Sequence, residues 1–306
     1  MSHVAHWDDV VGRERHAGDI HATWIDLGSA AGSDRVGLAR IRITPGRRST
    51  PAHIHGAEEE IFHVLAGSGL LWQDGETCRV GPGDTIAHVP GGQTHTLRAG
   101  DDGLDVLAFG TRVPIELCYL PRAGYAWAGP TVVETHGLRN LFRLDDDAGE
   151  FVFPEPGERF ANVAAIDDVQ AMQGGPPGRV RLDLGSAAGS AHTGLKHVRS
   201  DAGKLICVPH CHSAEEELFV VVDGDGVCEL GDRSFPVRPG SVIGRPAGTG
   251  VAHAIRAGES GIAVLAYGTR EPSDICYYPR SGKIYIGGLG VIGRIEPVDY
   301  WEGEEL

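Results

Sequence analysis

The sequence has little of what places a chain in a membrane or outside the cell. No apolar run among its 306 residues approaches the roughly 20 residues that a transmembrane helix needs. The first ten residues, MSHVAHWDDV, contain neither a cationic stretch nor an apolar one, so they do not resemble a secretory signal. The six cysteines show no CxxC spacing, which favours free thiols and a reducing compartment. We therefore expect a cytoplasmic protein without a membrane partner.

Basic residues are also scarce. The chain has 27 Lys and Arg against 42 Asp and Glu, which gives a formal net charge of −15. Nucleic-acid binding depends on clustered Lys and Arg side chains, so we expect no nucleic-acid partner. Long helical periodicity is absent, whereas 45 glycines and 18 prolines separate many short Val, Ile, Leu and Phe runs. This composition predicts an all-β chain.

One stretch of the sequence occurs twice. PAHIHGAEEEIFHVLAG at 51–67 returns as VPHCHSAEEELFVVVDG at 208–224, displaced by 157 residues. Successive side chains of a β-strand point to opposite faces, so histidines spaced i and i+2 share a face and lie about 7 Å apart. Two imidazoles so placed can bind one ion together with a carboxylate from the next strand. These residues are His53, His55 and Glu60 in the first copy and His210, His212 and Glu217 in the second.

A third histidine follows each glutamate after a turn that contains proline and glycine. His95 comes after Pro90 in the first copy, and His253 comes after Pro246 in the second. Three imidazoles and one carboxylate suit a divalent transition metal (Fe, Mn, Ni, Co, Cu or Zn) and leave two positions of an octahedral ion open. We therefore predict one metal ion in each half of the chain and a small-molecule substrate that chelates it through the open positions.

The repeat reaches well beyond these residues. DLGSAAG at 26–32 returns at 183–189, and a segment that ends in CYLPRAG returns in a form that ends in CYYPRSG. Each unit has about 150 residues, which is enough for a core of its own. The sequence therefore predicts two domains, 1–150 and 151–306, with the connecting segment beginning at about 137.

With both motifs in place, the chain resembles the cupin superfamily, whose motifs read roughly G-x5-HxH-x3–4-E-x6-G and G-x5-PxG-x2-H. Because the motifs occur twice, the resemblance is to a bicupin. It implies an all-β fold of two tandem double-stranded β-helix barrels, also called jelly-roll or cupin barrels. It further implies that the two barrels pack as a pseudo-twofold pair within one chain, and it leaves a homo-oligomer open.

Strand alternation assigns the neighbours of the predicted ligands. If Glu60 and Glu217 point into their barrels, Phe62 and Phe219 do so too, where they line a pocket or fill the core. The residues between them then face outward. On the strand that contains Glu217, the outward-facing residues, beginning with Leu218, are apolar. Such a surface is usually covered by another part of a protein. We expect that cover from the other barrel or from another subunit.

Charged residues near these strands admit two interpretations. Glu59 and Glu216 precede the predicted ligands, and we expect them in solvated turns, with Glu59 as an alternative ligand. Polar residues on two further predicted strands could anchor a carboxylate if they faced inward. We favour the outer face, because barrel interiors are mostly apolar. These residues are Arg40, Arg42, His197 and Arg199.

Together the residues favour a metal-dependent enzyme that acts on a small oxygenated organic acid or phenol. We favour a dioxygenase; the alternatives are a metal-assisted isomerase or hydrolase and a non-catalytic metal- or small-molecule-binding protein. Oxalate-decarboxylating bicupins have an arginine three residues before the first motif histidine, whereas Thr50 and Cys207 stand there in this chain. The sequence assigns no catalytic residue. The longer turn before His253 slightly favours the second barrel as the reactive one.

Overall fold

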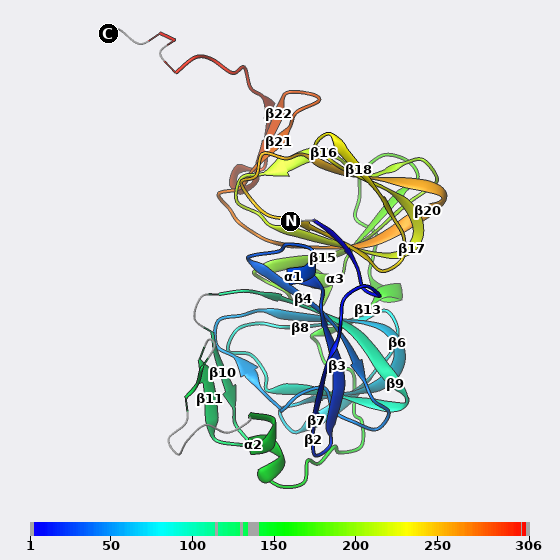
Figure 1. The fold of residues 1–306 in the computed structure, drawn as a ribbon, viewed down its shortest axis with the longest axis vertical. Coiled ribbons are helices and arrows are strands. Elements are labelled where there is room, and N and C mark those ends of the chain that lie inside the picture. Colours follow the sequence, from blue (N-terminus) through cyan, green and yellow to red (C-terminus); the bar gives the residue numbers. More distant parts are fainter. Residues whose placement is uncertain (1–2, 114–115, 129–130, 134–140, 301, 304–306) are drawn as a thin grey trace.

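Two β-barrels stacked along the long axis form the molecule (Figure 1). The computed structural model describes residues 3–113, 116–128, 131–133, 141–300 and 302–303. The strand order confirms the predicted all-β fold of two tandem double-stranded β-helix barrels. None of the described helices is long and apolar enough to cross a membrane.

The N-terminal barrel contains an eight-stranded sheet and a smaller sheet of four strands. The strands of the larger sheet are β2 (Arg13–Ala17), β3 (Ile20–Asp26), β4 (Val36–Ile43), β6 (Glu60–Gln73), β7 (Glu76–Val80), β8 (Asp84–His88), β9 (His95–Thr111) and β13 (Val163–Ala165). They pair in the order β13–β8–β6–β9–β4–β3–β2, with β7 beside β6. The smaller sheet has the order β12–β11–β10–β5. Its strands are β5 (Ile54–His55), β10 (Leu117–Leu120), β11 (Tyr125–Ala128) and β12 (Thr131–Val133).

The C-terminal barrel repeats this plan in one eleven-stranded sheet. Its strands are β1 (Val4–His6), β14 (Arg179–Asp183), β15 (Thr193–Ser200), β16 (Leu205–His212), β17 (Glu217–Leu230), β18 (Arg233–Val237), β19 (Ser241–Arg245), β20 (His253–Thr269), β21 (Ile275–Tyr278), β22 (Lys283–Ile286) and β23 (Val291–Arg294). Helical segments are short. They are α1 (Leu27–Ala30), α2 (Leu141–Asp147), α3 (Leu184–Ala187), η1 (Ile166–Asp168) and η2 (Gly287–Leu289).

The glycine that ends each histidine motif lies where the longest strands shift register. Gly67 on β6 and Gly224 on β17 have φ angles of 80° and 73°, a region that L side chains rarely adopt. A Cβ at either position would stand 2.2 Å from a carbonyl oxygen of the facing strand. Only glycine therefore fits, and the shift lets one long strand change direction within the barrel wall.

The two barrels exchange short edge strands. β1, from the start of the chain, pairs antiparallel with β19 of the C-terminal barrel, with Val4 opposite Ile243. β13, from the start of the second repeat, pairs with β8 of the N-terminal barrel, with Val163 opposite Ile86. The domain boundary at residue 150 stays a prediction, and the start of the connecting segment at about 137 lies outside the described residues.

The apolar outer faces of the two barrels form one core between them. Ile61 and Leu218 are both fully buried in a cluster to which each barrel contributes. Phe62 and Phe219, one position further along their strands, lie instead in the cores of their own barrels. The structure therefore confirms the predicted alternation, and it shows that the other barrel supplies the cover for the outer face.

The prediction of solvated turns at Glu59 and Glu216 is wrong. Their side chains are 1% and 0% exposed, because each carboxylate reaches into a loop of the opposite barrel. Glu59 accepts hydrogen bonds from the hydroxyl of Ser190 and from the backbone N–H groups of 191–193. Glu216 accepts them from the Ser33 hydroxyl and from two backbone N–H groups that follow it. Glu59 therefore points away from the predicted metal site and is no alternative ligand there.

The polar residues of β4 lie on the outer face, as predicted. Arg40 forms two hydrogen bonds with Asp105 at 3.0 and 2.6 Å, and its guanidinium carbon lies 4.0 Å from the centre of the Trp7 ring. Ile41 and Ile43 fill the interior instead. On β15 the same parity places His197 and Arg199 outside, but it turns one charged neighbour inward, as described below.

Candidate metal centres and the C-terminal cavity

The first predicted ligand set lies together, largely buried, in the N-terminal barrel. His53 precedes β5, His55 ends β5, Glu60 begins β6 and His95 begins β9. One ligand atom from each of the four lies within 4.8 Å of the others. The Oε2 atom of Glu60 is 3.9, 3.6 and 3.0 Å from the Nε2 atoms of the three histidines.

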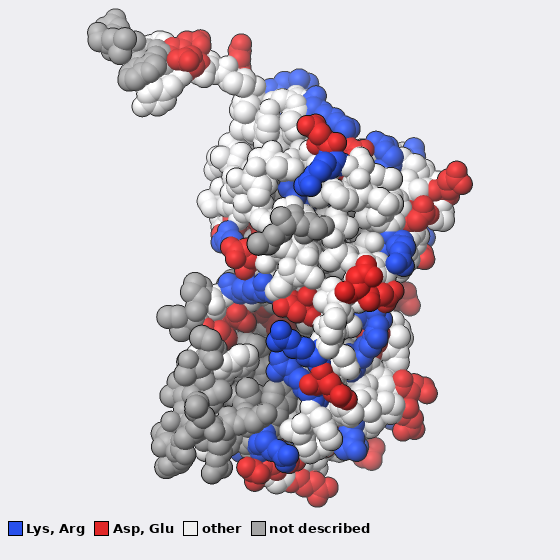
Figure 2. All heavy atoms as spheres, in the orientation of Figure 1, with Lys and Arg blue, Asp and Glu red and all other residues white. Residues whose placement is uncertain are grey.

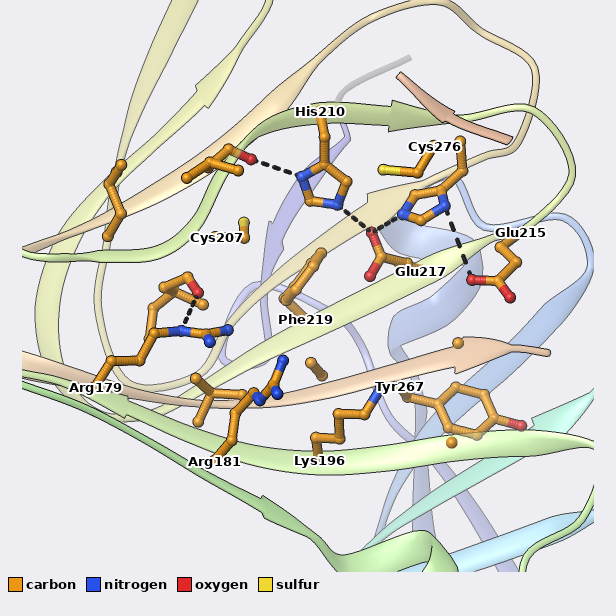
Figure 3. A pocket seen from close by; sticks show the side chains of 18 of the residues that line it. Arg179, Arg181, Lys196, Cys207, His210, Glu215, Glu217, Phe219, Tyr267 and Cys276 are labelled. Atoms are coloured by element: carbon orange, nitrogen blue, oxygen red, sulfur yellow. Dashed lines mark hydrogen bonds and ion pairs between the residues drawn. The ribbon is translucent and has the colours of Figure 1, made fainter. Parts of the chain in front are cut away.

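The second set surrounds its glutamate in a similar way in the C-terminal barrel. His210 and His212 end β16, Glu217 begins β17 and His253 begins β20. The Oε2 atom of Glu217 is 3.6, 3.3 and 3.0 Å from the Nε2 atoms of His210, His212 and His253. Figure 3 shows the labelled His210 on the wall of the cavity, with its ring directed at the Glu217 carboxylate.

Backbone carbonyls orient three of these imidazoles. The Nδ1 atoms of His53, His95 and His210 lie 2.9, 3.0 and 2.7 Å from the carbonyl oxygens of the residues two positions earlier. A carbonyl oxygen only accepts, so Nδ1 carries the proton in each ring. The Nε2 lone pair then faces the glutamate and is free for an ion.

Carboxylates outside the ligand set lie beside two of the other three histidines. The Nδ1 atom of His55 is 3.3 Å from Glu116, and that of His212 is 2.7 Å from Asp274. Sequence reasoning missed both acids. The signal was there, because each stands two residues before the cysteine of the repeated CYxPR segment. Asp274 forms a hydrogen bond with the His212 ring and so fixes its orientation, whereas Glu116 forms only an ion pair with His55. Either negative charge raises the basicity of the ring toward a bound metal.

Burial and neighbouring charges shift the pKa values of the predicted histidine ligands in opposite directions. Burial, with the neighbouring imidazoles, lowers the pKa of His53 to about 3. Burial also lowers the pKa of His253, to about 4. Burial acts in the same direction on His55 and His212, but the surrounding carboxylates outweigh it and raise the pKa of each to about 9.

Several buried polar atoms of the two sets have no hydrogen-bond partner. They are Nδ1 and Nε2 of His55, Nε2 of His212, both ring nitrogens of His253 and Oε2 of Glu217. A buried polar atom without a partner is costly. A divalent ion that accepts the Nε2 and Oε2 lone pairs would remove this cost at most of these atoms, so the residues present fit a metal.

A cavity of about 730 Å³ lies beside the second ligand set. His210, Glu217 and Phe219 line one side of it, and Cys207 and Tyr278 also contribute. Strands β14 and β15 form the opposite wall, which carries cations. These are Arg179, Arg181 and Lys196. In Figure 3 the labelled side chains of Arg181 and Lys196 extend from that wall into the cavity, whereas Arg179 is hydrogen-bonded to a backbone carbonyl. Sequence reasoning missed all three, because it assumed an apolar barrel interior and did not treat 179–183 as part of the wall.

The N-terminal barrel differs on the same wall. Ala22, Trp24 and Ala39 occupy the positions that correspond, by the repeat and the strand register, to the three cations. A hollow of about 610 Å³ at this barrel includes Glu60 and Trp24 in its lining. Beside the ligand, the His88 ring stacks on His95 with centroids 3.5 Å apart. The two ligand sets are therefore alike, whereas the spaces next to them are not.

Comparison with known proteins supports this architecture. The family model of the cupin domain matches the chain twice, at residues 39–109 and 196–267. No curated protein matches the sequence. Oxalate decarboxylase from Bacillus subtilis shares the fold, with a TM-score of 0.59 and 14% identity over 89% of this chain and 78% of that chain. A formate complex of oxalate decarboxylase from Lactobacillus farciminis has a TM-score of 0.60 and 15% identity over 87% and 85%.

The fold and the repeated ligand pattern define a double-barrel β protein of the bicupin class. The chain belongs to the cupin superfamily, as the doubled family match shows. At 14–15% identity the solved structures establish the fold alone.

Proposed function

We propose that this bicupin is a metal-dependent enzyme that acts on a small organic acid in its C-terminal barrel. One observation carries the proposal. The cavity beside His210, His212, Glu217 and His253 is lined on its far side by cations, a combination that suits an anionic molecule next to a metal. A negatively charged phenolate fits the same electrostatics less specifically, because guanidinium groups match carboxylates geometrically.

The four residues of each set would hold one divalent transition metal. When bound, such an ion polarises a coordinated oxygen and stabilises negative charge that develops on the substrate. The protein's own residues then have separate tasks. Asp274 keeps the His212 ring in place, and Val208 does so for His210 through its carbonyl oxygen. Phe219 narrows the cavity beside the ligands.

The reaction that we favour is O₂-dependent oxidation of the bound acid, because three histidines and one glutamate would hold a transition metal that can supply redox chemistry. The alternative is an isomerisation or hydrolysis without an oxidant, for which a bound ion would supply only stabilisation of negative charge. The solved structures named above are Mn(II)-containing or formate-bound oxalate decarboxylases, which supports an organic acid as substrate. Cys207, at the position where such enzymes have an arginine, argues against oxalate itself.

Metal analysis and turnover assays test the proposal together. Protein purified without chelator should contain a divalent transition metal, and it should consume one member of a panel of hydroxy, oxo and dicarboxylic acids. An oxygen electrode decides between the oxidative and the non-redox versions. The matched variants are Glu217→Gln, which should lower kcat/KM by about 100-fold or more, and Glu259→Gln on the exposed part of β20, which should leave it unchanged. Metal-free protein, or a kcat/KM that Glu217→Gln leaves unchanged, would overturn the proposal.

A further inference from the structure

The C-terminal cavity has two walls with different chemistry. The ligand wall comes from β16, β17 and β20, and the basic wall from β14 and β15. On the paired strands, Arg181 lies opposite Val198, and Asp183 opposite Lys196. Because side chains alternate along a strand, Arg179 and Arg181 share one face of β14, and Lys196 lies on the same face of the two-strand ribbon. All three line the cavity.

No carboxylate among the described residues forms an ion pair with the cations of this basic wall. Neither Arg181 nor Lys196 forms an ion pair within the described part of the chain, and the Nε atom of Arg181 is buried without a hydrogen-bond partner. Arg179 donates its Nε–H to the Ile206 carbonyl at 2.6 Å, which directs the guanidinium across the wall. Burial and the neighbouring Arg181 lower the pKa of Arg179. Clustered cations without a counter-ion are unfavourable in a cavity, so the wall suits a ligand that brings negative charge.

The fold does not require these cations. The N-terminal barrel has the same strand pairing and the same ligand pattern with Ala22, Trp24 and Ala39 in their place. Comparison of the two barrels therefore shows that packing of the barrel does not depend on these three cations. In the C-terminal cavity they form a positively charged surface opposite the metal-ligand set.

We infer that the C-terminal cavity binds acids with two separated anionic groups. The chelating end lies at His210, His212, Glu217 and His253, and a distal carboxylate is bound by Arg181 and Lys196. This inference rests on the proposed function for the role of the metal, but the basic wall defines the substrate class. The two walls belong to different strands, so a spacer must join the two anionic groups. Phe219 lies between the walls and offers its ring to that spacer (Figure 3).

Calorimetric titration of the Mn²⁺-loaded full chain tests the inference with matched probes. 2-Oxoglutarate and 2-oxopentanoate share the chelating end and the chain length, but only the first has a distal carboxylate. We expect 2-oxoglutarate to bind at least tenfold more tightly. Arg181→Gln and Lys196→Met should each reduce this ratio to below about threefold, since each removes one charge–charge contact with the distal group.

Arg199→Gln is the matched control, because Arg199 lies on the exposed outer face of the same strand as Lys196. It should leave the ratio unchanged. Thermal unfolding of every variant shows that it is folded, and the unchanged binding of 2-oxopentanoate shows that the metal site is intact.

Equal binding of the two acids, or a ratio that persists in the Arg181→Gln/Lys196→Met double variant, would overturn the inference. So would the absence of binding by either acid. These outcomes differ from failure of the proposed function. A strong preference for the diacid without turnover of any acid would support the inference and contradict the proposed enzymatic function. Metal-dependent turnover of monoacids alone would support the enzymatic function and contradict the inference.

Discussion

Glu59 of the N-terminal barrel accepts hydrogen bonds from both the backbone N–H and the hydroxyl of Thr193 in the C-terminal barrel. Glu216 makes the reciprocal connection to Ser33. Each of these carboxylates directly precedes a predicted metal ligand, Glu60 or Glu217. At the start of β6 and of β17, neighbouring residues therefore serve the interface between the barrels and a candidate metal centre.

Replacing Glu59 by Gln should destabilise the whole chain. The amide keeps the size of the side chain but presents an NH₂ group to N–H donors that a carboxylate had satisfied, and we expect a loss of about 3 kcal/mol in the free energy of unfolding. Glu216→Gln should behave alike. Chemical denaturation measures the effect, with Glu76→Gln on an exposed position of β7 as the control. A loss no larger than that of the control would show that the reciprocal carboxylates do not hold the barrels together.

Separated halves should not give well-behaved monomers. Residues 1–150 alone would expose Ile61 and would lose the edge strand β13, and 151–306 alone would expose Leu218 and lose β1. We expect insoluble or self-associating protein from each, as judged by size-exclusion chromatography with light scattering. Folded monomers from both halves would contradict this prediction.

Removal of metal should lower the melting temperature. An ion that binds only the folded chain stabilises it by about 2.7 kcal/mol when its free concentration is a hundred times its dissociation constant. Differential scanning calorimetry with and without a chelator measures the shift. Glu60→Gln and Glu217→Gln should each lose one of the two ions and part of the shift. A melting temperature that does not change when the chelator is added would argue against both metal sites.

The C-terminal barrel should carry the reaction. Glu217→Gln should lower kcat/KM by about 100-fold or more, because a change in the ligand itself exceeds the effect of changes around it. Glu60→Gln should spare most of the activity, since Ala22, Trp24 and Ala39 stand where the C-terminal cavity has its three cations. Steady-state kinetics together with metal content tests the assignment. If Glu60→Gln abolishes turnover and Glu217→Gln does not, the N-terminal barrel is the catalytic one.

His63 should make the protein less stable in acid. Its ring is buried on β6, with Nδ1 2.8 Å from the Thr85 hydroxyl, and burial lowers its pKa from 6.5 to about 3. Between these values the unfolded chain binds a proton that the folded chain does not. The stability that the neutral ring contributes is therefore complete above pH 6.5 and is lost as the pH falls toward 3.

The variant His63→Val isolates this contribution, because valine occupies the equivalent position, Val220, in the second repeat. Below pH 6.5 the wild type should lose up to about 1.4 kcal/mol more per pH unit than the variant. Denaturation curves of metal-free protein from pH 7.5 to 5 measure the difference, with the value at pH 7.5 as the reference for packing. Parallel pH dependences would show that His63 does not titrate in this way.

The sequence by itself determined the double barrel and the composition of both candidate metal centres. The histidine spacing is local, and strand alternation converts it directly into side chains on one face, so His53 and His55 could be placed together without any knowledge of the rest. The same alternation separated Ile61 from Phe62 correctly. The internal repeat, with displacements of 156 to 158 residues, transferred each assignment from one half of the chain to the other.

Tertiary structure alone decided what surrounds these centres. Glu59 looked like part of a solvated acidic run, and its partners lie more than 130 positions away in a loop whose approach no local pattern reveals. Lys196 and Arg181 lie on strands that face the predicted ligands only once the barrel has folded. The reason is physical: spacing along one strand fixes which face a side chain takes, whereas the environment of that face depends on the strands and loops that pack against it.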